Sequence, residues 1–144
     1  MLPDRMGDPM IKGYSLKFDH RPHYLAVQVD GPEDTLAISL AYWSEIAVEC
    51  RRHHVSRLLV VEKLATHSNV DDVSLLVAEL PRMGFSDIRI AYVDTTESVD
   101  VMVHAELESR KFGLNGHVFG NESSAVRWLL DDIALDVGLR GSAA

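Results

Sequence analysis

The stretch Arg57-Leu-Leu-Val-Val-Glu62 is a nearly unbroken run of branched apolar residues, and it decides the fold class. Such a run is typical of a strand that is buried on both faces, as in parallel sheets covered by helices. A similar run, Asp87-Ile-Arg-Ile-Ala-Tyr-Val93, follows further along the chain. Because helix signals separate the two runs, the sequence predicts parallel strands joined by a right-handed helical crossover.

Two strands and a helix are expected before this core run. Residues 14–19 alternate apolar and polar side chains, which is the period of a half-buried strand, and Tyr24-Leu-Ala-Val-Gln-Val29 follows after a short turn. The short connection predicts an antiparallel hairpin. Gly31-Pro32-Glu33-Asp34-Thr35 then favours the start of a helix that we expect to run to about His53.

A second helix is expected after the core run. Ser68 and Asp71 have the spacing of an acidic capping box, and apolar residues follow them three or four positions apart. Pro81 and Gly84 are expected to end this helix.

A third helix, a short strand and a last helix complete the pattern. Asp94-Thr-Thr-Glu-Ser98 favours a helix start, Gly116-His-Val-Phe119 is strand-like, and Asn121 is suited to cap the last helix. The buried stripe of the third helix is predicted to consist of Val99, Met102, Val103 and Leu107.

These elements predict a single α/β domain over residues 13–134, with a flexible leader at 1–12 and a flexible tail at 135–144. Its sheet is mixed and mostly parallel, with about five strands, an N-terminal antiparallel hairpin and four helices.

Composition excludes several classes of protein. The 144 residues carry 14 Lys and Arg against 22 Asp and Glu, so the net charge is -8. An acidic chain repels phosphate backbones, and we therefore expect no nucleic-acid partner. A single cysteine excludes an internal disulfide, and the apolar runs are too short to span a membrane. The first residues lack the apolar stretch of a secretory signal, so a cytoplasmic location is expected.

Catalytic and metal-binding signatures are missing from the sequence. It contains no Gly-rich phosphate loop, no Gly-x-Ser-x-Gly elbow and no His-Glu-x-x-His, which favours a protein that is not an enzyme and carries no cofactor. An enzyme with a polar site at the strand ends, using Lys63, His67 and Asp94, remains an alternative. No metal site is expected, because His20 and His23 have no third ligand near them in sequence and the adjacent His53 and His54 point about 100° apart on a helix.

Three segments together resemble the SpoIIAA-like branch of the STAS superfamily, small domains related to bacterial anti-sigma-factor antagonists. They are Arg57-Leu-Leu-Val-Val-Glu-Lys-Leu64, Ile90-Ala-Tyr-Val-Asp94, and Asn115-Gly-His-Val-Phe119 followed by Ala125-Val-Arg-Trp-Leu129. The resemblance covers about Tyr14 to Leu130. It implies a mixed sheet with helices mainly on one side, and a regulatory or protein-binding role without catalysis.

The resemblance also implies where a protein partner binds. Signalling relatives carry Asp-Ser-Ser-Gly at the start of the second helix, where phosphorylation of a serine releases the partner. Residues 68–74 depart from this motif, so either Ser68 or Thr66 is the phosphorylated group or the aspartates supply a permanent negative charge. The predicted partner-binding residues are Thr66, His67, Ser68, Asn69, Asp71 and Asp72.

The sequence leaves two further interactions open besides a protein partner. A small apolar, lipid-like ligand would lie between sheet and helices, in a pocket lined by Leu40, Trp43, Met102 and Trp128. A homodimer would form through the edge hairpin or the long first helix, both of which offer surfaces to a second copy.

Overall fold

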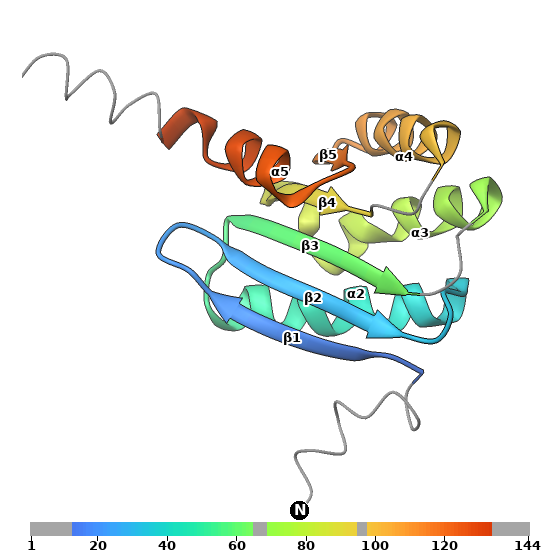
Figure 1. The fold of residues 1–144 in the computed structure, drawn as a ribbon, viewed down its shortest axis with the longest axis horizontal. Coiled ribbons are helices and arrows are strands. Elements are labelled where there is room, and N and C mark those ends of the chain that lie inside the picture. Colours follow the sequence, from blue (N-terminus) through green and yellow to red (C-terminus); the bar gives the residue numbers. More distant parts are fainter. Residues whose placement is uncertain (1–12, 65–68, 95–97, 134–144) are drawn as a thin grey trace, which may run out of the picture.

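A computed structural model describes residues 13–64, 69–94 and 98–133 of the protein. Within them, five strands form one sheet in the order β1-β2-β3-β4-β5 (Figure 1). The strands are β1 (Ser15–His20), β2 (Leu25–Gly31), β3 (Arg57–Leu64), β4 (Arg89–Val93) and β5 (Asn115–Phe119).

The strand directions confirm the predicted fold class. β1 and β2 pair antiparallel, whereas β2, β3, β4 and β5 all run parallel. Helical crossovers connect the parallel strands, as their direction requires. The helices are α2 (Leu36–Arg52), α3 (Val70–Met83), α4 (Val99–Lys111) and α5 (Glu122–Leu129), with a short 3-10 turn, η2 (Phe85–Asp87), before β4.

The two faces of the sheet are covered unequally. A large core lies between the sheet and α2 and α3, with α4 packed at its margin, and α2 passes behind the strands in Figure 1. A smaller core lies on the opposite face, where α5 packs on β3 and β4. Three of the four long helices are therefore on one side of the sheet, which is the arrangement that the family resemblance implied.

The prediction for α3 was wrong about the residue that caps its start and about the effect of Pro81. Asn69 caps this helix, with its side-chain oxygen accepting from the backbone N of Asp72 at 2.8 Å. The capping interaction is thus one residue later than the predicted pair of Ser68 and Asp71, and Ser68 lies outside the described residues. Pro81 does not end the helix, because in the last turn it removes only one backbone donor.

Other predicted ends are confirmed. Gly84 ends α3 in the left-handed conformation, with φ of 102°, which favours glycine. Asn121 caps α5 by accepting from the backbone N of Ser124 at 2.9 Å.

The predicted buried stripe of α4 is wrong for three of its four residues, whereas Met102 is half-buried. Val99, Val103 and Leu107 are exposed, at 73%, 52% and 55% of their surface. The inward side instead carries Val101 and Ala105, which are half-buried, and no α4 residue is fully buried. Apolar residues lie on two sides of this helix. The sequence therefore does not decide how the helix is rotated about its axis, and the prediction chose the wrong side.

Side chains fix α4 to its neighbours. Ser74 Oγ on α3 lies 2.6 Å from His104 Nε2. Glu106 Oε1 accepts from the backbone N of Val118 at 2.9 Å, on the edge strand β5. Polar contacts therefore add to the packing of Val101 and Ala105 in holding α4 to its neighbours.

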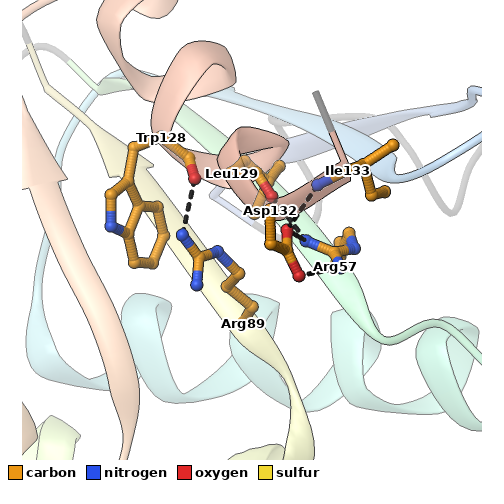
Figure 2. Close-up of polar contacts among 6 residues, drawn as sticks. All are labelled: Arg57, Arg89, Trp128, Leu129, Asp132 and Ile133. Carbon is orange, nitrogen blue, oxygen red and sulfur yellow. Dashed lines mark hydrogen bonds and ion pairs between the residues drawn. The ribbon is translucent and has the colours of Figure 1, made fainter. Parts of the chain in front are cut away.

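Two arginines from adjacent strands anchor the end of α5, as Figure 2 shows. Arg89 Nη2 donates to the carbonyl oxygen of Trp128 at 2.6 Å, and its guanidinium stacks on the Trp128 ring. Arg57 Nη1 donates to the carbonyl oxygen of Leu129 at 2.8 Å and forms an ion pair with Asp132, which lowers the pKa of that carboxyl to about 2. These donors satisfy carbonyls that a helix end leaves without intrahelical partners.

The predicted leader at 1–12 and the predicted tail at 135–144 both lie outside the described residues. Among the helices described, none combines the length and the apolar character needed to cross a membrane.

Candidate functional site

Buried polar side chains gather where β3 and β4 end. Glu62 on β3 is only 4% exposed, and Asp94, directly after β4, is 2% exposed. Strand alternation turns Glu62 and Tyr92 toward the face that α2, α3 and α4 cover, because their neighbours Val60 and Ile90 belong to the large core.

The carboxyl group of Glu62 is held by two donors. The hydroxyl of Tyr92 donates to Oε2 at 2.6 Å, and the backbone N of Leu64 donates to Oε1 at 2.9 Å. Such partners satisfy a buried polar group that would otherwise be costly to remove from water.

The N-terminal part of α2 completes this polar cluster. Ser39 Oγ donates to Asp34 Oδ1 at 2.6 Å, and both side chains are buried. The hydroxyl of Tyr42 contacts Tyr92 and Ser39, which links the α2 side of the cluster to the strand side. The polar cluster therefore consists of Asp34, Ser39, Tyr42, Glu62, Tyr92 and Asp94.

Burial raises the pKa of Glu62 to about 8. The hydrogen bond from Tyr92 works in the opposite direction, and the charges of Asp94 and Asp34 raise the pKa further. Burial also raises the pKa of both Tyr42 and Tyr92 above the ordinary value for tyrosine. At neutral pH the Glu62 carboxyl therefore keeps its proton, and both phenols stay neutral.

A cavity of about 80 Å³ adjoins the polar cluster between the sheet and helices α2, α3 and α4. Its polar lining residues include Ser39, Tyr42 and Tyr92 of the polar cluster, together with His117 on β5. Small side chains of α4, Ala105 and Ser109, border it and leave the space unfilled. The apolar part of its wall includes Trp43, Val73, Leu76, Val77, Leu80, Ile90, Val101, Met102 and Leu114.

Trp43 is the most informative residue in this wall. Its ring stacks on Tyr92 with centroids 6.2 Å apart and meets Phe85 edge-on at 5.3 Å. Among the residues that the structure describes, its buried Nε1 has no hydrogen-bond partner. Because a buried N–H without a partner costs free energy, this atom is a natural binding point for an acceptor on a ligand.

The residues predicted to line an apolar pocket are only partly brought together. Trp43 and Met102 both line the cavity. Leu40 is half-buried on α2 but does not border the cavity. Trp128 lies across the sheet, beside the small core, where it stacks on Arg89.

The structure describes half of the predicted partner-binding residues. Asp71 is exposed at the start of α3, whereas Asn69 and Asp72 bind each other, with Asn69 Nδ2 donating to Asp72 Oδ2 at 3.1 Å. Thr66, His67 and Ser68 lie outside the described residues.

Two of the three residues of the alternative enzyme site belong to the described part of the chain. Lys63 is exposed, while Asp94 is buried. His67 lies outside the described residues.

Sequence reasoning missed the contact of Glu62 with Tyr92 and the role of Ser39. The position of Glu62 at the end of an apolar run was a usable signal. A carboxyl group that is buried there needs hydrogen-bond partners or has to be neutral. The register that places Glu62 beside Tyr92 depends on tertiary pairing, which the sequence does not reveal.

No protein-family model matches the chain, and no curated protein matches it. The resemblance to the SpoIIAA-like branch of the STAS superfamily therefore stays a prediction.

Proposed function

We propose that the protein is a small-molecule-binding module whose cavity takes an apolar group with one hydrogen-bond acceptor. The observation that carries this proposal is that Trp43 lines a mostly apolar cavity while its buried Nε1 has no hydrogen-bond partner among the described residues. A ligand acceptor would satisfy this donor, and the apolar wall would bind the rest of the group.

The size of the cavity limits the ligand. Ligand pockets usually measure roughly 300–1,000 Å³, whereas this cavity measures about 80 Å³. The cavity therefore suits a small ring or a short acyl group. A larger ligand requires α4 to move outward, and this helix has no fully buried residue to resist that movement.

The polar lining of the cavity further restricts the ligand. Ser39, Tyr42 and Tyr92 border the cavity, and Glu62, which accepts from the Tyr92 hydroxyl, holds a proton at neutral pH and adds no charge there. A charged ligand would have to leave water for a mostly apolar cavity, so a neutral ligand fits better.

Titration with cyclohexanone, a small ring with one carbonyl acceptor, tests the proposal by NMR. The chain has two tryptophans, and Trp43→Phe identifies their two indole N–H signals. We expect the Trp43 signal to shift and the Trp128 signal to stay in place. Ala105→Phe should lower the affinity at least about tenfold, because the larger ring fills the cavity.

Native mass spectrometry of the freshly purified protein gives a second readout. A retained apolar mass in the unaltered protein that is lost in Ala105→Phe supports the proposal. The proposal fails if folded protein shows neither a retained mass nor a shift of the Trp43 signal at millimolar cyclohexanone.

A second candidate function, partner-protein recognition at the start of α3, is favoured by an exposed pair of side chains. Asp71 and Leu75 are exposed, with Leu75 showing 57% of its surface, and they lie one turn apart on the same side of the helix. A regulatory partner would find an apolar anchor beside a fixed negative charge, without needing a phosphate. Self-association through the β1–β2 hairpin, and a cytoplasmic location, likewise stay predictions.

Charge reversal tests this second candidate. Asp71→Lys should reduce capture of the partner from a lysate of the source cells at least about tenfold, because like charges then oppose each other across the interface. Glu79→Lys reverses a charge elsewhere on α3 and serves as the matched control. Equal capture by both variants and the unaltered protein would exclude the start of α3 as the recognition surface.

A further inference from the structure

Three potential metal ligands, one of them distant in sequence from the other two, meet at one end of α2. Glu49 and His53 lie one helical turn apart there, and His20 reaches them from the end of the edge strand β1. The rings of His20 and His53 have their centroids 4.4 Å apart. The packing of the β1–β2 hairpin against α2 brings His20 to the other two residues.

The distances among these side chains are close to those of a metal site. Glu49 Oε2 lies 2.7 Å from His20 Nε2 and 3.4 Å from His53 Nε2, and the ligand atoms of all three residues lie within 4.8 Å of one another. Ligands about 2.1 Å from a tetrahedral Zn²⁺ are separated by roughly 3.4 Å. A metal ion therefore needs side-chain movements of roughly 1 Å, including a longer separation of His20 from Glu49.

The types of ligand select the class of metal. Two imidazoles and one carboxylate are a common set for Zn²⁺ with an open fourth position, whereas Mg²⁺ and Ca²⁺ prefer oxygen ligands. We propose that His20, Glu49 and His53 bind one Zn²⁺ or a chemically similar divalent transition-metal ion.

Access and burial both suit this proposal. The side chain of Glu49 is 15% exposed, whereas His20 and His53 are 42% and 46% exposed, so the carboxylate is fixed and the imidazoles face solvent. A hollow of about 200 Å³ borders both histidines and also includes His23 and His54. Water can complete the coordination.

One positive charge competes for the same carboxylate. Arg52 Nη1 lies 3.8 Å from Glu49 Oε1, at the other oxygen from the one that faces the histidines. The pair is exposed on the arginine side, and such surface pairs are weak. It therefore leaves Oε2 available to a metal ion.

A metal ion here would fasten the edge of the sheet to α2. β1 pairs with a single strand, β2, and its other end already contacts α2 through Tyr14 and Glu45. Zn²⁺ at His20 would join the second end of β1 to the end of α2. Binding only to the folded chain would then raise its thermal stability.

Calorimetric titration with ZnCl₂ near pH 7.5, using protein without a histidine tag, tests the proposal. We expect one Zn²⁺ per chain, no binding of Mg²⁺ and a higher Tm with Zn²⁺. The variants His20→Ala, Glu49→Gln and His53→Ala each remove one ligand. Loss of a residue that only hydrogen-bonds to a ligand weakens metal binding about 10- to 100-fold, so we expect a larger loss of Zn²⁺ affinity in these variants. With Co²⁺ in place of Zn²⁺, a tetrahedral site gives intense visible absorption.

His117 provides a matched control, because it forms a surface pair with Glu106 at 3.3 Å but belongs to no three-ligand group in the described part of the chain. His117→Ala should leave the Zn²⁺ affinity unchanged. If His20→Ala fails to fold, His20→Gln retains a hydrogen-bond donor to Glu49 but is a poor zinc ligand. Absent binding at micromolar Zn²⁺, or equal affinity in the His20 and His117 variants, overturns the proposal.

Discussion

The protein should lose about 4 kcal/mol of its free energy of unfolding as the pH rises from about 4.5 to about 8, through Glu62 alone. The folded protein holds the Glu62 proton more tightly than the unfolded chain, because burial raises the pKa from 4.5 to about 8. This contribution to stability is complete below about pH 4.5 and lost by about pH 8. Glu62→Gln cannot ionise, so it should be more stable than the unaltered protein at pH 9 and lose that advantage toward pH 5.

Urea unfolding at several pH values from 5 to 9 measures this effect, because the difference between the two proteins cancels the titration of all other groups. Glu79→Gln removes a partly exposed carboxylate on α3 and controls for a simple change in net charge. A constant difference between Glu62→Gln and the unaltered protein over this range would show that Glu62 is ionised when folded.

Replacing Phe85 with alanine should cost about 3–5 kcal/mol of stability, which is a large share of the roughly 5–15 kcal/mol of a typical domain. Phe85 is fully buried in η2 and packs edge-on against Trp43. Its loss removes buried area, leaves a cavity and deprives the Trp43 ring of one supporting side chain.

Urea unfolding gives the loss in stability, and near-ultraviolet circular dichroism reports whether the Trp43 ring becomes mobile. Phe85→Leu keeps most of the apolar volume and should cost less than about 2 kcal/mol. A similar cost for Leu and Ala at this position would mean that the aromatic ring, and not its volume, stabilises the core.

Much of the fold follows from local patterns. The apolar run of β3 and the helix signals on either side predict a parallel sheet, and the short turn before β2 predicts the hairpin. Both features can be predicted locally, because a strand buried on two faces requires a run of apolar residues and a tight turn requires a short connection. The rotation of α4 could not be predicted from its sequence. Val99, Val103 and Leu107 form an apolar stripe that suggests a buried side, but the structure leaves these residues exposed.

The candidate site was harder to predict. Trp43 and Met102 carry the apolar signal of a pocket, but Trp128 carries the same signal and lies on the opposite face of the sheet, so composition alone does not separate the two cores. The polar cluster depends on strand register, which places Tyr92 beside Glu62. The meeting of His20 with Glu49 and His53 depends on how the hairpin packs on α2, and these contacts are non-local.

The bond from Val118 to Glu106 has a consequence for behaviour at high concentration. β5 is the last strand of the sheet, and an outer strand with free amides is a template on which strands from other molecules can add. Glu106 occupies one of those amides and places a carboxylate along the border of the sheet. This side chain should therefore help to keep crowded copies from joining edge to edge into growing aggregates.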